Sequence, residues 1–245
     1  MKKLLYLLLS SVLFSSVALA TPTITEPVAE LASSTDASSY AMTAFTPTAN
    51  AVLLVFVHAS GTVATGTMSG GGLTWTKKTS VLNNTTDTNY LFWAKTGSSP
   101  VSTTVTFDCT GDAATGVIMA AFQATGADIV TADPIKQVKT NAATAANPTV
   151  TMDTALTTTN AYAGFFGVPR NPPTSAAPAS WTETLDTGHT TPTQGASGAY
   201  RNGGETGTTV TFTSVSAAYG IIVAEVYNTG AGPSAGNAQL IHAID

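Results

Sequence analysis

The sequence is short of charge and of cysteine. Asp, Glu, Lys and Arg together make up 9% of the 245 residues, and Cys109 is the one cysteine. No intramolecular disulfide can form, so stability has to come from apolar burial, and a chain of this length can bury roughly 70% of its unfolded surface. We expect Cys109 to be a small buried side chain, because a reactive thiol needs a nearby base.

Clusters of basic residues are lacking as well. The formal net charge is −5, and without Lys2 and Lys3 seven Lys and Arg (nine minus two) face fourteen Asp and Glu, which gives −7. Binding of phosphate groups draws on clustered Lys and Arg. The composition therefore argues against nucleic acid as a partner.

The common catalytic patterns are absent. His58, His189 and His242 are isolated, so no H-x-x-x-H pair is available for zinc, and no G-x-S-x-G element occurs. The glycine run at 70–72 lacks the Lys and Thr of a phosphate-binding loop. The carboxylates are scattered, whereas glycoside hydrolysis needs a facing pair. We expect a protein that is not an enzyme.

The first twenty residues have the pattern of a secretory signal peptide. Lys2 and Lys3 precede an apolar run over 4–17, and Ala18-Leu19-Ala20 fits a cleavage site. The run is short for a membrane span, which needs about 20 apolar residues. We expect cleavage after Ala20, a secreted, cell-surface or periplasmic location, and no membrane contact after removal of the signal.

What the sequence has in abundance is threonine and an internal repeat. Thr occurs 45 times, which suits half-exposed β-strands. Residues 113–127 (AATGVIMAAFQATGA) and 217–231 (AAYGIIVAEVYNTGA) agree at eight of fifteen positions, and TTVTF precedes both, at 103–107 and 208–212. These matches predict two duplicated halves.

Period-2 alternation predicts an all-β protein, because Val105 and Phe107 alternate with threonines and no segment of the mature chain has helical spacing. The fold expected is a jelly-roll-like antiparallel β-sandwich built from two internally duplicated halves. Two separate Ig-like domains are the alternative, and the absence of a stiff linker over 125–147 favours one sandwich. Twelve strands are expected, near 40–46, 50–58, 73–82, 89–96, 102–108, 115–124, 148–153, 160–168, 180–186, 196–202, 207–213 and 217–228.

The domain layout follows from these patterns. We expect a signal peptide at 1–20, a flexible N-terminal arm at 21–39, and one pseudo-symmetric sandwich over 40–230, with halves at about 40–135 and 136–230. A C-terminal tail follows at 231–245. The arm could add a strand to the sheet edge of a neighbouring molecule, which would be a route to self-association.

The order of several motifs resembles a known family. Asn50-Ala51 and its apolar strand are followed by Trp75, NYLFWAK (89–95) and TTVTF, then by ATGAD (124–128). This order is similar to that of uncharacterised jelly-roll domains in secreted bacterial proteins and in phage structural or tail-associated proteins. The resemblance implies a jelly-roll fold and an extracellular or virion-surface setting. It implies no catalysed reaction. Relatives often carry Glu where this chain has Ala121.

Aromatic residues are the main candidates for binding. Trp75 and Trp181 occupy equivalent repeat positions, and we expect both to be core wedges. Trp93 alternates with Phe92, so we expect one of the two to face outward, and Tyr200 is the counterpart of Trp93 in the repeat. An exposed Trp can stack on a sugar ring. The candidate ligand-binding residues are Trp93, Tyr200, Tyr90, His58 and Arg170.

Three aspartates are candidate metal ligands. Asp108 and Asp112 flank the tight segment DCTGD, and Asp87 lies in the NNTTDTN loop (83–89). Carboxylate oxygens of this kind could hold a structural Ca²⁺, although the spacing is not that of an EF-hand. Turn formation, in which Asp bonds to its own backbone, is the alternative that we favour. No other cofactor is expected.

The sequence thus predicts a secreted, non-enzymatic β-sandwich that acts by surface contact. Glycan binding or adhesion, with a cell-surface or environmental polysaccharide as the partner, is the first hypothesis. A phage virion component or a self-assembling extracellular protein is the second. Glu225 interrupts an apolar strand, and we expect it at an exposed strand end or hydrogen-bonded inside the sandwich rather than in a catalytic role.

Overall fold

The computed structural model describes residues 21–229, except 62, 84–85 and 113. The signal peptide expected at 1–20 and the tail expected at 231–245 lie outside these residues. The described residues form β-strands and no helix, and therefore include no helical segment able to cross a membrane. All strand pairs are antiparallel, so the expectation of an all-β sandwich is confirmed.

The first large sheet has the strand order β1-β9-β4-β7-β6, and β2 also pairs with β9. Its strands are β1 (Thr23–Thr25), β2 (Leu31–Ser33), β4 (Val52–Ser60), β6 (Thr76–Leu82), β7 (Thr88–Lys95) and β9 (Gly116–Thr125). The second large sheet has the order β10-β18-β12-β15-β14. Its strands are β10 (Ile135–Ala145), β12 (Ala161–Val168), β14 (Thr182–Thr190), β15 (Thr193–Asn202) and β18 (Ala217–Val226).

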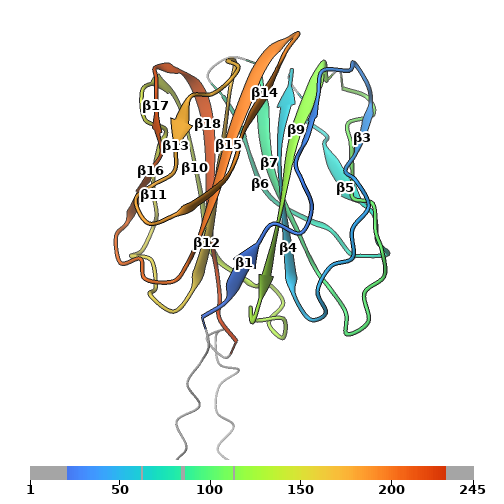
Figure 1. Ribbon diagram of the computed structural model, residues 1–245, viewed down its shortest axis with the longest axis vertical. Helices are drawn as coiled ribbons and strands as arrows, with labels where there is room; N and C mark the ends of the chain where they lie inside the picture. The colour runs from blue at the N-terminus through green and yellow to red at the C-terminus, as the bar shows by residue number, and fades with distance from the viewer. Residues whose placement is uncertain (1–20, 62, 84–85, 113, 230–245) are drawn as a thin grey trace, which may run out of the picture.

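Small sheets cover the outer face of each large sheet (Figure 1). The first is covered by β3 (Ser39–Ala41), β8 (Thr106–Asp108) and β5 (Thr67–Ser69), in the order β3-β8-β5. The second is covered by two pairs, β11 (Thr149–Thr151) with β16 (Thr209–Thr211) and β13 (Ser175–Ala176) with β17 (Thr213–Ser214). The two large sheets thus form the inner layers of the molecule.

Three hydrophobic clusters hold these layers together. The inter-sheet core takes side chains from both large sheets, among them Phe56 and Phe165, whose stacked rings lie 5.5 Å apart. A first outer core lies under β3-β8-β5, and a second lies under β11-β16 and includes Phe212. Each half therefore has an outer core of its own in addition to the shared one.

Period-2 alternation explains why the central strands are apolar on both faces. In β4, Leu54 and Phe56 enter the inter-sheet core, whereas Leu53 and Val55 enter the first outer core. A strand that is covered on both faces has a sequence of consecutive apolar residues. The same packing accounts for the tryptophans of the repeat, because Trp181 lies in the second outer core and Trp75 packs half-buried against the first.

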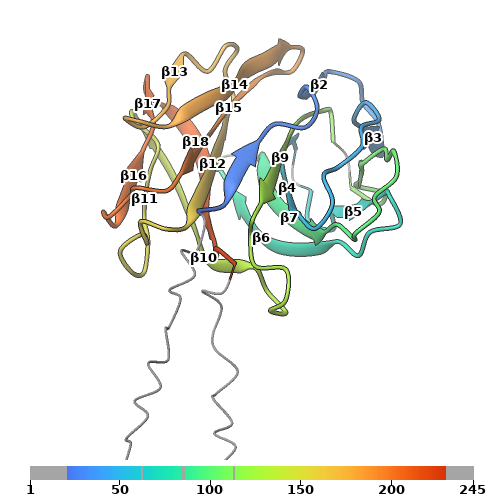
Figure 2. The same ribbon diagram turned by 60° about the horizontal axis from the view of Figure 1, so that its bottom comes forward.

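All twelve expected strands coincide with strands of the structure, with the ends displaced by a few residues. The structure adds β1, β2, β5, β10, β13 and β17. Residues 21–39 were expected to be a flexible arm, and that expectation is wrong for this part of the chain. β1 pairs with Gln123–Thr125 and β2 with Val117–Met119, so the segment completes the edge of its own first sheet rather than that of a neighbour (Figure 2).

Ile24 gives a direct test of this N-terminal edge. Its side chain is fully buried in the inter-sheet core, whereas Thr25 beside it is exposed. We expect Ile24→Ala to lower the free energy of unfolding by about 2–5 kcal/mol, because it leaves a cavity. Thr25→Ala, the control, should change it by less than about 1 kcal/mol. Denaturant unfolding measures both, and equal small losses would mean that the segment contributes no core packing.

Candidate ligand-binding site

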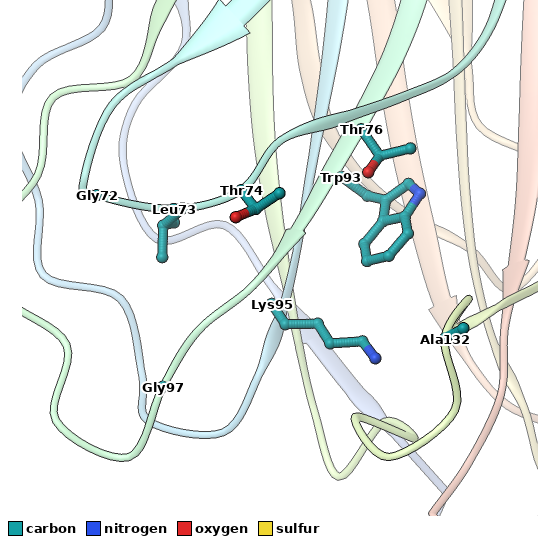
Figure 3. A pocket seen from close by; sticks show the side chains of 8 residues that line it. All are labelled: Gly72, Leu73, Thr74, Thr76, Trp93, Lys95, Gly97 and Ala132. Atoms are coloured by element: carbon teal, nitrogen blue, oxygen red, sulfur yellow. The ribbon is translucent and has the colours of Figure 1, made fainter.

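The candidate site is a cavity of about 530 Å³ at one edge of the first large sheet (Figure 3). Three segments meet there: the chain leading into β6, the end of β7, and the loop from β9 to β10. The residues that line the cavity are Gly72, Leu73, Thr74, Thr76, Trp93, Lys95, Gly97 and Ala132. One of them, Trp93, is a binding residue expected from the sequence.

Trp93 forms the apolar wall of the cavity. β7 lies between β4 and β6 in the sheet, and its alternate residues Tyr90 and Phe92 enter the first outer core while Leu91 and Trp93 enter the inter-sheet core. The expectation that either Phe92 or Trp93 faces outward is wrong: their exposed fractions are 2% and 9%. The reason is that layers cover both faces of β7, so Trp93 reaches the cavity with a small part of its ring.

The indole N–H of Trp93 is buried and has no hydrogen-bond partner among the described residues. In Figure 3 the indole nitrogen points away from Lys95, and the six-membered ring is the part of the side chain nearer to the lysine. Buried polar groups without a partner are rare in folded proteins. The six-membered ring therefore contributes apolar surface to the cavity, and the unpaired indole N–H lies on the side of the ring away from Lys95.

Lys95 adds a positive charge on the same side of β7 as Trp93. Its Nζ atom lies 5.9 Å from the centroid of the Trp93 ring and donates a hydrogen bond to the carbonyl oxygen of Thr131. In Figure 3 the side chain extends beneath Trp93 toward Ala132. Because an ammonium group carries three donors, this bond leaves two for other acceptors.

The rim consists of five exposed residues, two threonines and three small residues. Thr74 and Thr76 carry their hydroxyls on the segment that enters β6, and Gly72, Gly97 and Ala132 complete the rim. The glycine run places this segment: Gly70 has φ +121°, and a Cβ atom there would lie 2.1 Å from the Thr104 carbonyl oxygen. Only glycine fits such a position. The cavity thus depends on the turn at 70–72.

The structure brings none of the other four expected binding residues into this cavity. Tyr90 is fully buried in the first outer core, and burial raises its pKa to about 12. Tyr200 is half-buried on β15, with its ring 6.2 Å from that of Phe122. Arg170 is half-buried in the loop after β12. These residues come from different faces of two sheets, which the linear sequence does not reveal.

His58 belongs to a buried polar network between the two large sheets. Its Nδ1 lies 2.7 Å from Asn89 Oδ1, and its Nε2 lies 2.9 Å from Gln194 Oε1. The amide nitrogen of Asn89 donates to the Gly220 carbonyl oxygen, which directs Asn89 Oδ1 toward the imidazole. His58 is 1% exposed. This histidine therefore joins the sheets and does not line a surface site.

Each of the three candidate calcium ligands accepts hydrogen bonds from other residues of the chain, and Asp108 alone bonds a backbone N–H two residues away. Asp112 Oδ2 accepts from the backbone N–H groups of Ala64 and Thr65 and from the Thr65 hydroxyl, and these bonds lower its pKa. Asp108 Oδ1 accepts from the Thr110 N–H. Asp87 accepts from Gly61 and Asn83. No group of three or more His, Cys, Asp or Glu side chains suited to a metal occurs in the described part of the chain.

Glu225 is fully buried and hydrogen-bonded inside the second half, which confirms the second of the two placements expected for it. Its carboxylate accepts from Lys136 Nζ at 3.2 Å, Gln137 Nε2 at 2.5 Å, the Thr157 N–H at 2.9 Å and Asn160 Nδ2 at 2.7 Å. Burial alone would raise its pKa, but these bonds and the lysine charge outweigh burial and lower it. Glu225 thus fastens β10 and the loop before β12 to β18.

Most of the cavity escaped prediction from the sequence. Lys95 could have been found, because it follows Trp93 by two residues and so lies on the same face of the strand. Thr74 and Thr76 lie beside Trp93 through the pairing of β6 with β7, in which Thr76 is opposite Trp93. Ala132 comes from the loop joining the two halves, and no local pattern places it there.

Comparison with family models, with curated proteins and with solved structures finds no match to this chain. The resemblance to the jelly-roll family stays a prediction from the sequence.

The lowered pKa of Glu225 predicts a pH-dependent contribution to stability. The ionised carboxylate stabilises the fold fully above its ordinary pKa of 4.5, and this stability is lost as the pH falls through the lower folded pKa. At neutral pH, Glu225→Gln should lower the free energy of unfolding by about 1–3 kcal/mol. The reason is that the new amide N–H group would face the donors that now bond to the carboxylate. The difference from the wild type should shrink as the pH falls below about 4.5.

Denaturant unfolding at pH 7, 5, 4 and 3 measures this difference. The exposed Glu30→Gln is the control and should follow the wild type throughout. If the difference in free energy of unfolding between Glu225→Gln and the wild type stays constant down to pH 3, the role assigned to the carboxylate is wrong.

Proposed function

We propose that this protein is an exported, non-enzymatic β-sandwich that binds a polysaccharide, and that the cavity beside Trp93 is its binding site. The observation that carries the proposal is the combination, in one cavity, of a tryptophan ring with exposed hydroxyls and an ammonium group. The leader expected at 1–20 supports a location outside the cytoplasm, where cell-surface or environmental glycans are found.

The chemistry of the lining supports a sugar as the ligand. A pyranose has an apolar face of C–H groups and a rim of hydroxyls, which matches an aromatic ring surrounded by polar groups. Trp93 supplies the part of its ring that reaches the cavity, and Thr74 and Thr76 supply hydroxyls that both donate and accept. The volume of about 530 Å³ lies within the range of small-molecule sites.

The same lining supports binding without cleavage. Hydrolysis of a glycosidic bond requires two carboxyl groups on opposite sides of the bond. None of the eight lining residues carries a carboxyl group, and none is a histidine, serine or cysteine. The side chains present can orient a sugar through stacking and hydrogen bonds, which is the work of an adhesion or carbohydrate-binding module.

Replacement of Trp93 tests the proposal. Trp93→Phe should weaken retention on the bound polysaccharide about three- to tenfold, because the smaller ring offers less stacking surface. Trp181→Phe is a matched control: both tryptophans are 9% exposed, but Trp181 lies in the second outer core. Affinity electrophoresis in gels of different soluble polysaccharides gives the retention, and thermal melting shows whether each variant is folded.

A second substitution avoids the core. Thr76→Val removes a hydroxyl from the rim at nearly constant shape, and it should weaken retention severalfold. Thr151→Val makes the same change at an exposed position on β11 and should have no effect. If the intact protein is retained by no polysaccharide of a broad panel, or if Trp181→Phe weakens retention as much as Trp93→Phe, the proposal is wrong.

A further inference from the structure

The charged residues in and beside the cavity bear on which class of polysaccharide it would bind. Lys95 is the one charged side chain among the eight lining residues. The carboxylate nearest in sequence to the loop wall is Asp133, next to Ala132, and Asp133 is neutralised by an ion pair with Lys78. Asp128, in the same loop, is buried, and its Oδ1 accepts hydrogen bonds from the backbone N–H groups of Val130 and Thr131. The one charge carried by the lining residues themselves is thus positive, on a protein whose formal net charge is −5.

Lys95 is also available for an anion. Of the seven Lys and Arg residues in the described part of the chain, four form ion pairs: Lys78, Lys136, Lys139 and Arg201. Lys95 forms none with a described residue, and its bond to the Thr131 carbonyl uses one of three donors. That bond holds the ammonium group beneath Trp93 without cancelling its charge.

We propose that the ligand is an anionic polysaccharide, whose sugar ring lies against Trp93 while its acidic group accepts hydrogen bonds from Lys95. This inference rests on the glycan-binding function proposed above and specifies the class of glycan. A hydrogen bond between an ammonium group and an anion is about twice as strong as one between neutral groups. The attraction between the charges is also stronger in a half-buried site than in open water, because the local dielectric constant is lower. Lysine is a point charge, so a sugar carboxylate and a sulfate ester present the same chemistry to it.

Pairs of polymers that differ only in charge test the inference on the wild-type protein. Polygalacturonate is compared with the same polymer after reduction of its carboxyl groups, and dextran sulfate is compared with dextran. We expect the charged member of at least one pair to bind about tenfold more tightly at low salt, and this advantage to shrink as the salt concentration rises. The pair that shows the advantage identifies the acidic group as carboxylate or sulfate.

Variants then locate the charge that is responsible. Lys95→Met should remove most of the difference in affinity between the charged and the neutral polymer, and Lys95→Arg should retain part of that difference. Lys77→Met is the matched control, because Lys77 also lies over an aromatic ring, 5.7 Å from the centroid of Tyr90, and forms no ion pair with a described residue. It does not line the Trp93 cavity.

The outcomes separate this inference from the function on which it rests. Equal binding of charged and neutral polymers would overturn the anionic preference and leave glycan binding intact. Equal losses in Lys95→Met and Lys77→Met would show a general effect of charge and would also overturn it. Binding of no polymer at all would overturn both proposals. The wild-type comparison decides the preference even if a variant fails to fold.

Discussion

The close approach of the two large sheets is the constraint on which the rest of the structure depends. The inner face of the second sheet includes small residues such as Ala163, Ala196 and Ala224. A Cβ atom on Gly198 would lie 3.3 Å from the Phe122 ring, so Phe122 of the first sheet packs over a position without a side chain, whereas Phe56 stacks on Phe165. Complementary large and small surfaces reach the packing density of a protein interior. Because Trp93 belongs to this core, the approach of the sheets also fixes the wall of the candidate site.

Polar groups at one end of the interface make this approach specific. A Cβ atom on Gly167 would lie 2.1 Å from His58 Nδ1, and one on Gly220 would lie 2.4 Å from Asn89 Nδ2, so backbone of the second sheet touches side chains of the first. Gln194 completes the network from β15. A buried polar group is costly unless it is bonded, so a shifted alignment of the sheets would leave His58 and Asn89 unsatisfied. The network therefore favours one alignment, whereas apolar packing alone tolerates several.

The success of the sequence in placing strands, and its failure elsewhere, have one physical cause. Strands such as β4 and β18 are buried on both faces, so their apolar runs carry the signal within the strand itself. β10 is an edge strand with the sequence IKQVKTNAATA, mostly half-buried, and it is a strand because β18 offers it hydrogen bonds over its whole length. The burial of Trp93 could not be predicted for the same reason. Alternation shows that Trp93 and Phe92 face opposite sides of the sheet, but the layers that cover those sides come from distant parts of the chain.

The surroundings of Trp93 differ from those of Tyr200, which the sequence repeat aligns with it. Lys95 and Asn202 each follow the aromatic residue by two positions. Asn202 Oδ1 accepts a hydrogen bond from the Ile24 N–H at 2.7 Å, and its amide nitrogen donates to the Ile24 carbonyl at 3.4 Å, so β1 is bound against β15 beside Tyr200. Lys95 instead holds the Thr131 carbonyl, and the loop around it leaves the edge of Trp93 in a cavity. The N-terminal segment thus lies against β15 beside Tyr200, whereas the loop that Lys95 holds borders the cavity at Trp93.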